Sequence, residues 1–359
     1  MREDALIIGA GQAAAQLAAS LRQGGFDKPI SIIGDEPYPP YQRPPLSKKF
    51  LSENGSPESL FLRPAGFWHD QDVVLHLGSD AAQVDLRQRR VALRNGRELD
   101  FGVLVFATGT RARTLPLPGI GLPNVFSLRN IDDVRRLRPA LDQARRVAIV
   151  GGGYIGLEVA AGLCRQGREV TVVEAEARLM KRVMGESGAA FFAEVHRRQG
   201  VDLKLGARLV AIEATAVDLS VHIGATEVFT VDLVLIATGA RANDELAAAA
   251  GLPCDDGILV DELARTGITD VYAIGDCARF PSRRYGRRLR LECVQNAIDQ
   301  AKTAAAAIRG EKQPYDPVPW FWSDQYDLKL QIAGDLCEKQ AAAELSDYQA
   351  KRRADARQQ

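Results

Sequence analysis

The sequence has few cysteines, and none belongs to a close pair. Five cysteines occur in 359 residues, and each is separated from the next by more than ten residues. Such spacing excludes a zinc ribbon, which needs paired thiolates, and a dithiol reductase, which needs two adjacent cysteines. Scattered thiols are typical of a reducing compartment, so we expect a cytoplasmic protein. The five are Cys164, Cys254, Cys277, Cys293 and Cys337.

Long apolar runs and an excess of one charge are also lacking. No stretch approaches the 18 uninterrupted apolar residues typical of a membrane helix. The apolar residues 5–19 follow Glu3 and Asp4, where a signal peptide would be cationic, so we expect no leader. Basic and acidic residues number 46 each, which argues against a dedicated nucleic-acid binder. We therefore expect neither a membrane nor a nucleic-acid partner.

One pattern of strand, glycine turn and helix occurs twice. Residues 5–14 read ALIIGAGQAA and residues 147–156 read VAIVGGGYIG. Each copy precedes a second β-rich strand that ends in an acid, and each is followed later by Ala-Thr-Gly, at 107–109 and 237–239. Strands that alternate with helices favour parallel sheets. We predict an α/β protein with two Rossmann-like dinucleotide-binding domains, plus a short C-terminal α+β segment.

The glycines in both copies suit a bound dinucleotide. Gly11 and Gly153 allow the backbone to approach a pyrophosphate at a helix N-terminus, which carries about half a positive charge. Ala14 and Gly156 allow the helix to pack closely on the strand. Either each copy binds one dinucleotide, or one copy keeps only the turn.

An acid about 20 residues beyond each turn is positioned to bind a ribose. Asp35 follows Gly11 by 24 residues and Glu174 follows Gly153 by 21. A carboxylate at Glu174 favours a free 2′-hydroxyl, and hence NADH over NADPH. Nearby Arg178 and Arg182 would weaken the preference for NADH; the alternative is that they lie only at a solvent-exposed helix start.

Residues 269–277, TDVYAIGDC, predict a strand that ends in Gly-Asp. At the edge of a doubly wound sheet, Asp276 is placed to accept hydrogen bonds from the ribityl hydroxyls of a flavin. The alternative is a purely structural strand-to-helix cap.

Four segments closely resemble the NADH-dependent ferredoxin reductases, flavoproteins that serve bacterial dioxygenases and cytochromes P450. They are residues 34–48 (GDEPYPPYQRPPLSK), 154–161 (YIGLEVAA), 273–280 (AIGDCARF) and 319–326 (PWFWSDQY). The resemblance covers residues 4–334, with apoptosis-inducing factor as a distant relative. It implies an FAD-binding domain of residues 1–112 and 241–316, interrupted by an NAD-binding domain of residues 113–240. Residues 317–359 would then be a shortened C-terminal domain with a polar tail.

The resemblance also implies the site residues. Lys48 and Glu158 would pair beside the flavin N5 edge, and Trp322 would lie by the isoalloxazine and the nicotinamide, unless it only packs in a core. The implied FAD contacts are Gly9, Gly11, Ala14, Asp35, Glu36, Arg43, Lys48, Arg129, Asp276 and Val294. The implied NAD contacts are Gly151, Gly153, Ile155, Gly156, Glu174 and Gly239.

Three positions depart from the family pattern. Cys293 stands where serine is common, near the flavin, and Ala242 replaces a proline in the second Gly-x-x-Pro-Asn turn. From Asp335 the chain continues as a polar tail, where the family has a further β-rich domain. The family's C-terminal domain covers the flavin and forms part of the partner surface, so we do not expect this chain to keep both in full.

We therefore expect hydride transfer from NADH to FAD, then single-electron transfer to a [2Fe-2S] ferredoxin or rubredoxin. With no cysteine pair to receive electrons, an external carrier is the natural acceptor. A basic cluster of six arginines would attract an acidic carrier electrostatically; the alternative is that it is only a charged, solvent-exposed face. The six are Arg279, Arg283, Arg284, Arg287, Arg288 and Arg290. Alternatives are a dinucleotide-binding redox sensor or low-activity truncated flavoprotein, and a monodehydroascorbate or peroxide reductase. The absence of cysteine before residue 164 disfavours peroxide chemistry. We expect a monomer or a weak homodimer.

Overall fold

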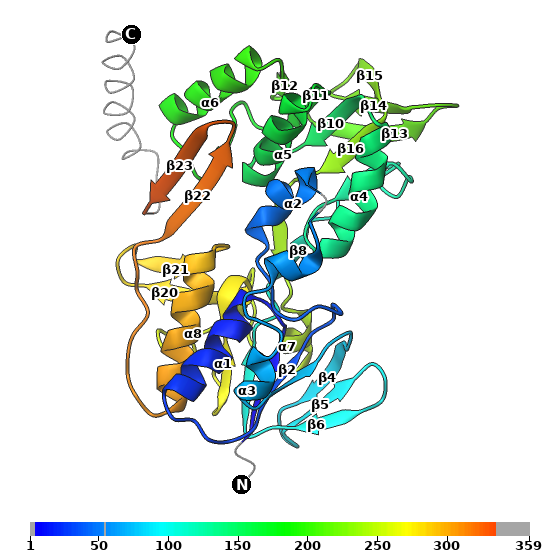
Figure 1. Cartoon of the computed structure of the whole chain (residues 1–359). Coiled ribbons are helices and arrows are strands. Elements are labelled where there is room, and N and C mark those ends of the chain that lie inside the picture. The colour runs from blue at the N-terminus through cyan, green and yellow to red at the C-terminus, as the bar shows by residue number, and fades with distance from the viewer. Residues whose placement is uncertain (1–3, 54, 335–359) are drawn as a thin grey trace. The chain divides into compact units, whose positions relative to one another are not determined.

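The computed structural model describes residues 4–53 and 55–334, and these fall into two compact units. The first unit comprises residues 4–43, 56–111 and 241–321, and the second comprises residues 44–53, 112–240 and 322–334. The chain leaves the first unit through β8 (Thr110–Ala112) and returns through β17 (Ala240–Ala242), and these two strands pair. Figure 1 labels the elements of both units.

A five-stranded parallel sheet forms the centre of the first unit. Its strand order is β19-β7-β1-β2-β3, and every neighbouring pair is parallel. The strands are short apolar runs, as expected for a sheet that is covered on both faces. Their bounds are Ala5–Ile8 (β1), Ile30–Ile33 (β2), Val73–His76 (β3), Val103–Phe106 (β7) and Val271–Ala273 (β19).

Two alanine-rich helices pack against each other over this sheet. Helix α1 (Gln12–Gln23) connects β1 to β2, and α8 (Val294–Ile308) follows the basic cluster. Their contact residues are small and fully buried, Ala14 and Ala18 on α1 and Ala301 and Ala304 on α8. Small side chains let the helix backbones approach closely, so the alanines of both helices allow the packing behind the glycine turn.

The remaining elements of the first unit are short. An antiparallel sheet contains β4, β5 and β6, and β18, β20 and β21 form another sheet. The strands are Ala81–Asp85 (β4), Arg90–Leu93 (β5), Glu98–Asp100 (β6), Ile258–Leu259 (β18), Ala278–Ser282 (β20) and Arg287–Leu289 (β21). The helical turns are Pro57–Leu60 (η2), Phe67–Asp70 (α3), Glu245–Ala249 (α7) and Gly275–Cys277 (η3).

The second unit has a parallel sheet with the same spatial strand order as the first. The order is β12-β11-β10-β16-β9, in which β10, β11, β12 and β16 correspond to β1, β2, β3 and β7. The edge strand β9 comes before β10 in the chain, whereas β19 follows β7. The predicted α/β fold with two Rossmann-like units is confirmed. The strands are Val125–Ser127 (β9), Arg146–Val150 (β10), Glu169–Glu174 (β11), Asp202–Leu205 (β12) and Leu233–Ile236 (β16).

Helices and two further sheets complete the second unit. The helical elements are Pro44–Ser47 (η1), Lys49–Ser52 (α2), Ile131–Gln143 (α4), Tyr154–Arg165 (α5) and Glu186–Arg198 (α6). The antiparallel sheet contains β13 (Leu209–Ala214), β14 (Leu219–Ile223) and β15 (Glu227–Val231). The hairpin of β22 (Trp320–Gln325) and β23 (Leu328–Ala333) buries Leu328 and Ile332 in one apolar cluster with α5 and α6.

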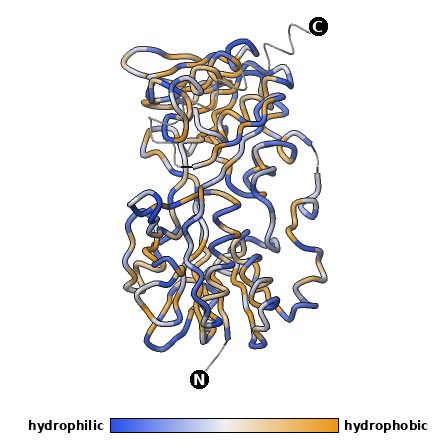
Figure 2. The backbone as a smooth tube through the Cα atoms, turned by 90° about the vertical axis from the view of Figure 1, so that its left-hand side faces the viewer, coloured by the Kyte–Doolittle hydropathy of each residue, from blue (hydrophilic) through white to orange (hydrophobic). Residues whose placement is uncertain are grey.

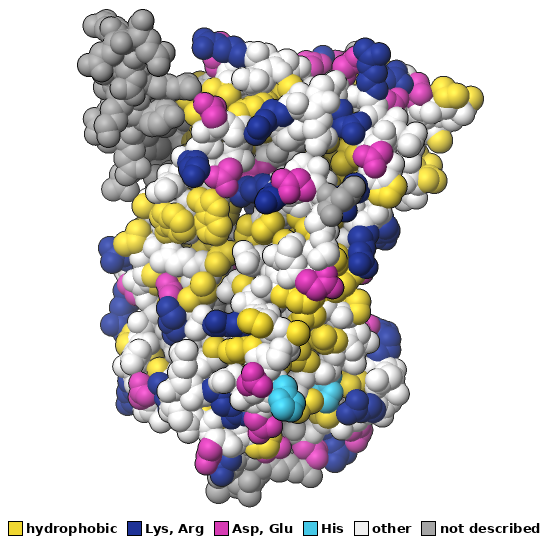
Figure 3. Space-filling model, viewed as in Figure 1, with side chains coloured by type: hydrophobic (Ala, Val, Ile, Leu, Met, Phe, Trp, Pro, Cys, Tyr) yellow, Lys and Arg dark blue, Asp and Glu magenta, His cyan; other side chains and the backbone are white. Residues whose placement is uncertain are grey.

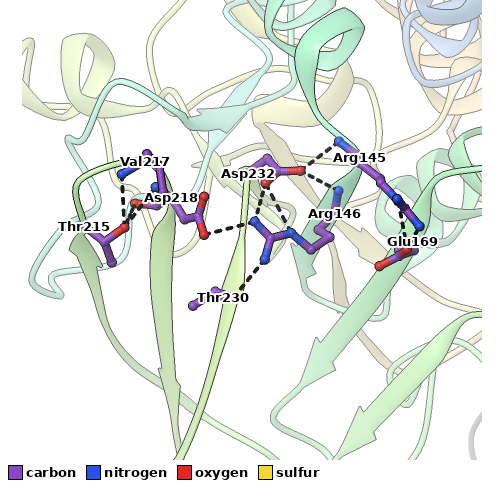
Figure 4. A network of polar contacts seen from close by, with 8 residues as sticks. All are labelled: Arg145, Arg146, Glu169, Thr215, Val217, Asp218, Thr230 and Asp232. Carbon is purple, nitrogen blue, oxygen red and sulfur yellow. Dashed lines mark hydrogen bonds and ion pairs between the residues drawn. The ribbon is translucent and has the colours of Figure 1, made fainter.

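An ionic network fastens the start of β10 to the neighbouring sheet (Figure 4). Arg146 lies 2.6 Å from Asp232 and 3.0 Å from Asp218, while Arg145 pairs with Glu169 at 2.7 Å. The backbone N–H groups of Arg145 and Arg146 also donate to Asp232. This network lies at the strand end opposite the glycine turn, so we assign it a structural role.

Hydrophobic, basic and acidic residues are all distributed along the chain and over its surface. Hydrophobic and hydrophilic stretches alternate along the chain in Figure 2, and Figure 3 shows basic and acidic side chains intermixed on the visible face. Among the helices that the structure describes, none is long and apolar enough to span a lipid bilayer.

Candidate functional site

The first glycine turn connects β1 to α1. Gly9 has a φ of +109°, and a Cβ there would lie 2.2 Å from the carbonyl oxygen of Ala107, so only glycine fits. Gly11 precedes α1, and a Cβ built on it meets no described atom within 4 Å. Within the described part of the chain, no side chain caps α1 and no acid occupies its first turn. The first turn of α1 thus has no capping side chain among the described residues, and an uncapped helix N-terminus behind a glycine turn fits the pyrophosphate of a dinucleotide.

The second turn, between β10 and α5, has the same geometry. Gly151 has a φ of +115°, and a Cβ there would lie 2.4 Å from the carbonyl oxygen of Ala237. Gly153 precedes α5, and its added Cβ again meets none of the described atoms within 4 Å. A Cβ on Gly156 would lie 2.1 Å from the oxygen of Gly151, whereas the first copy accommodates a fully buried Ala14. Each unit therefore has one glycine turn of this geometry, a cradle that would suit a dinucleotide.

Glu174 lies beside the second turn, at the end of β11. Its carboxylate accepts the backbone N–H of Gly152 at 2.6 Å and that of Glu176 at 2.8 Å. Ile155, on the first turn of α5, is 40% exposed. The strand end thus brings a carboxylate to the glycine turn, which is where an adenosine ribose would be bound.

In the first unit, the corresponding acids are Asp35 and Glu36. Asp35 is exposed, while Glu36 accepts hydrogen bonds from the Tyr41 hydroxyl and from Arg43, each at 2.6 Å. Burial opposes the charge of Arg43, yet the neighbouring Tyr41 and Glu36 outweigh burial and raise the pKa of Arg43. The guanidinium is therefore a permanent cation next to the acid.

Asp276 lies on η3, directly after β19. Gly275 has a φ of +75°, and its added Cβ would lie 3.1 Å from the Cβ of Ala13 on α1. The Gly275 N–H donates to Gln300 on α8 at 2.7 Å, and the Thr110 hydroxyl donates to Asp276 at 3.3 Å. The two helices therefore hold this Gly-Asp segment near the start of α1, as the sequence pattern predicts.

Lys48, Glu158 and Trp322 come together in the second unit. The Lys48 ammonium lies 3.2 Å from the Glu158 carboxylate, 3.3 Å from that of Asp324 and 5.9 Å from the ring centre of Trp322. Glu158 lies on α5, Lys48 precedes α2 and Trp322 lies on β22. Three segments that are far apart in the sequence thus meet at one cation.

Two serines that the sequence analysis did not single out complete the surroundings of Glu158. The Ser47 hydroxyl donates to Oε2 at 2.6 Å, and the Ser323 hydroxyl donates to Oε1 at 2.7 Å. Glu158 is only 7% exposed, so these bonds and Lys48 replace its lost hydration. Ser47 adjoins Lys48 and Ser323 adjoins Trp322, and this adjacency is the signal that could have identified them.

Two further predicted contacts, Arg129 and Gly239, belong to the second unit. Arg129 follows β9, and its backbone N–H donates to the Asp133 carboxylate at 2.8 Å. Gly239 has a φ of +98°, and an added Cβ would lie 3.1 Å from the guanidinium of Arg182.

The turn that lacks a proline is held by hydrogen bonds. Ala242 is buried in β17, and the next residue, Asn243, donates its side-chain amide to the oxygen of Thr108 at 2.8 Å. The Thr108 hydroxyl donates to the oxygen of Asn243 at 2.6 Å. These bonds restrain the segment in place of a proline ring.

The cysteine next to α8 is protected from ionisation. Cys293 immediately precedes Val294, the first residue of α8, and burial raises the pKa of its thiol to about 11. Burial also raises the pKa of Cys277, beside Asp276. Both thiols stay protonated at neutral pH, so neither has the character of a reactive thiolate. Cys337 lies outside the described residues.

The arginine cluster is partly neutralised by carboxylates. Its residues lie in β20, in β21, in the turn between them and directly after β21; Figure 1 labels both strands. Arg288 donates to the oxygen of Val260 at 2.8 Å, and Arg284 and Arg287 are exposed. The ion pairs join Arg279 to Asp255 (2.5 Å), Arg283 to Glu262 (3.4 Å), and Arg290 to Asp256 (3.3 Å) and Glu292 (2.7 Å). The basic field is therefore weaker than the sequence suggests.

Among the described residues, no group of three or more histidine, cysteine, aspartate or glutamate side chains is arranged to hold a metal ion.

The chain is similar to known reductases over most of its length. It is 42% identical to rhodocoxin reductase from Rhodococcus erythropolis, over 92% of this chain and 77% of that protein. A ferredoxin reductase from Rhodopseudomonas palustris superposes with a TM-score of 0.90 at 42% identity, covering 92% of this chain and 82% of that one. A covalent putidaredoxin reductase–putidaredoxin complex superposes with a TM-score of 0.88 at 36% identity, covering 92% and 81%.

Two family models match the chain. The pyridine nucleotide-disulphide oxidoreductase model covers residues 3–304, and proteins of that family use FAD and NAD(H). The reductase C-terminal model covers residues 320–353, and so continues past Gly334, where the resemblance was expected to end; residues 335–353 lie outside the described residues. The chain therefore belongs to the pyridine nucleotide-disulphide oxidoreductase family.

Proposed function

We propose that this protein is an FAD-dependent NADH:ferredoxin oxidoreductase. It would reduce a [2Fe-2S] ferredoxin or a rubredoxin that serves an oxygenase or P450 system, one electron at a time. The observation that carries the proposal is the convergence of Lys48, Glu158 and Trp322 in a chain with two glycine-turn cradles. The reductases named above and their ferredoxin partners support the same assignment.

Each cradle would hold one cofactor. In the first unit, Gly9, Gly11, Asp35 and Asp276 would hold FAD, and in the second, Gly151, Gly153 and Glu174 would hold NADH. Bound FAD supplies the redox chemistry, because it accepts a hydride from a nicotinamide and releases electrons singly. Overall, one NADH and two oxidised carriers would give NAD⁺, two reduced carriers and one proton.

Lys48 and the side chains around it would stabilise negative charge and exclude water. The ammonium would provide a positive charge for the electron-rich ring of the bound cofactor, and Glu158 and Asp324, at 3.2 and 3.3 Å, would fix its direction. The Trp322 ring, 5.9 Å from the ammonium, would help to exclude water. No residue is required to act as a nucleophile.

Stopped-flow mixing of the FAD-loaded protein with NADH tests the proposal. We expect flavin absorbance to bleach within one turnover and to recover when oxidised ferredoxin is added. A flavin that stays oxidised would reject the proposal. A yellow protein that changes its oligomeric state with NADH, but does not reduce a carrier, would favour the redox-sensor alternative. The cytoplasmic location and the oligomeric state, a monomer or a weak homodimer, stay predictions.

Glu174 is predicted to select NADH. In Glu174→Ala, we expect the ratio of kcat/KM for NADH to that for NADPH to fall about tenfold, or about 1.4 kcal/mol, because a repulsive carboxylate no longer faces the 2′-phosphate. Steady-state kinetics with both nucleotides measure the ratio.

The matched variant Glu174→Gln separates charge from structure. It removes the charge but keeps an oxygen that can accept the Gly152 N–H. We expect it to lose the same discrimination with a smaller rise in the KM for NADH. An unchanged ratio in both variants would remove Glu174 from the ribose site.

The exposed arginines of the β20–β21 hairpin are proposed to steer an acidic carrier. We assign this role chiefly to Arg284 and Arg287, which are exposed in and next to the turn between β20 and β21. In the double variant Arg284→Glu/Arg287→Glu, the second-order rate of ferredoxin reduction should fall about tenfold at low salt. The difference should vanish at about 1 M salt, where the Debye length is about 3 Å.

A double variant elsewhere in the same unit is the control. Arg87 and Arg94 are exposed on and after the β4–β5 hairpin, and Arg87→Glu/Arg94→Glu makes the same change in net charge. Equal losses in the two double variants would indicate an effect of total charge and would refute docking at the hairpin.

A further inference from the structure

A chain of buried polar side chains extends from Glu158 into the core of the second unit. Ser323 donates to Glu158 at 2.7 Å, and the Gln325 amide donates to the Ser323 hydroxyl at 3.2 Å. The Gln325 oxygen lies 2.9 Å from Nε2 of His196, and the Tyr326 hydroxyl lies 3.2 Å from Nδ1. Four hydrogen bonds thus link five side chains.

The chemistry of the donors fixes one direction for the whole chain. The Glu158 carboxylate, which pairs with Lys48, can only accept hydrogen bonds, so the Ser323 hydroxyl donates to it. The Ser323 oxygen then accepts the hydrogen bond from the Gln325 amide. The Gln325 oxygen can only accept, so His196 carries its proton on Nε2 and accepts the Tyr326 hydroxyl on Nδ1. Burial lowers the pKa of His196, which keeps the ring neutral in this tautomer. Every hydrogen bond therefore points toward Glu158.

Strand geometry places these side chains on one face of β22. Successive residues of a strand point to opposite faces, so Ser323 and Gln325 share the face toward α5 and α6. Trp322 and Asp324 lie on the other face, where both meet Lys48. The hairpin therefore contacts the Lys48–Glu158 pair from two directions.

These polar residues occupy positions where apolar ones would be the ordinary choice. Ser323, Gln325 and His196 are 0% exposed, and the surrounding cluster contains Leu157 and Met180. Buried polar groups lose hydration and at best recover it through their hydrogen bonds, so they add little stability in such a core. Local violations of core patterning are typical of functional sites.

We propose that Ser323, Gln325 and His196 are positioning residues that hold the Glu158 carboxylate, and through it the Lys48 ammonium, in one orientation. The proposal rests on the function assigned to Lys48 above. A serine hydroxyl rotates freely unless its partners direct it, and here Gln325 and His196 direct the Ser323 proton onto Oε1. The C-terminal hairpin would thereby set the geometry of the ion pair.

The kinetic test compares Gln325→Met with a matched core variant. Methionine has nearly the volume of glutamine but keeps neither hydrogen bond. Because small displacements of a positioned group are costly, we expect hydride transfer at saturating NADH to slow about tenfold, with an unchanged Kd for NADH. Leu328→Met, in the same cluster but outside the chain of hydrogen bonds, should keep the wild-type rate.

A second pair of variants tests for rescue. His196→Leu removes the donor to Gln325, whereas His196→Gln retains an amide N–H at a similar reach. We expect His196→Gln to recover most of the rate that His196→Leu loses. Wild-type rates in Gln325→Met and His196→Leu, or equal losses in both His196 variants, would overturn the proposal, even if the variants melt at lower temperature.

A third measurement needs no bound cofactor. In ¹⁵N-histidine NMR spectra of the FAD-free protein, His196 should show the Nε2–H tautomer. In Ser323→Ala, the Gln325 amide loses its acceptor, so we expect the His196 signals to shift although Ser323 and His196 share no bond. Unshifted signals would refute the chain. If NADH fails to reduce the wild-type flavin, the proposed function fails, while this NMR result still decides the coupling.

Discussion

Lys48→Met should slow the reduction of FAD by NADH about 100-fold, the loss typical of removing one preorganised electrostatic group from an active site. Methionine matches the length of lysine but leaves Glu158, which is 7% exposed, without its cation. Stopped-flow absorbance at saturating NADH measures the rate, and the FAD content of the purified protein shows whether the cofactor is retained.

The adjacent residue supplies the control. Lys49 is exposed and makes only a 3.6 Å surface contact with Glu53, so Lys49→Met changes the same charge one position along the chain. We expect it to keep the wild-type rate. Normal FAD retention together with normal reduction in Lys48→Met would exclude Lys48 from the site.

Gly11→Val should yield a folded but colourless protein. Gly11 has extended backbone angles that valine tolerates, and its added Cβ meets no described atom within 4 Å. The branched side chain would instead occupy the space assigned to the pyrophosphate. We expect FAD affinity to fall about 100-fold, near the upper range of about 3 kcal/mol for overpacking. FAD titration by fluorescence and a thermal melt of the apoprotein separate binding from folding.

Three further glycine variants separate a loss of FAD binding from a general effect of replacing glycine with valine. Gly267→Val, in an exposed loop of the same unit, should bind FAD normally. Gly153→Val should keep FAD and lose NADH binding, because it blocks the other cradle. Gly9→Val should fail to fold, since its Cβ would lie 2.2 Å from a backbone oxygen. A yellow Gly11→Val protein would contradict the assignment of the first cradle.

The repeat was predictable because it is local. Each unit begins with a strand, a glycine turn and a helix within ten residues, and backbone sterics require glycine at Gly9 and Gly151. The two parallel sheets with the same strand order confirm the predicted fold. The segments around Lys48, Glu158 and Trp322 also carried the family resemblance.

The surroundings of the ion pair were not predictable in the same way. Ser47 and Ser323 are 276 residues apart, and both bind one carboxylate on α5. The local signal is that each serine adjoins a predicted site residue, and this adjacency does not show that the hydroxyl binds a distant acid. His196 lies in a helix with ordinary amphipathic spacing, and only packing of the β22–β23 hairpin gives it Gln325 as a partner.

Charge and reactivity likewise depended on neighbours in space. The run of six arginines reads as strongly basic, but carboxylates from residues 255, 256, 262 and 292 approach it in the fold. Cys293 stands in the sequence where serine is common, near the expected flavin, and in the fold burial raises the pKa of its thiol to about 11. A pKa and a local field are sums over nearby groups, and the sequence does not say which groups are near.

The sequence by itself therefore determined the two dinucleotide-binding units, the glycines that open their cradles and the family, because backbone sterics and short-range patterning act within a few residues. Tertiary structure alone decided which side chains hold Glu158, which arginines remain exposed and which thiols stay protonated. Hydrogen bonding, desolvation and ion pairing act across space, and they join residues that the chain separates.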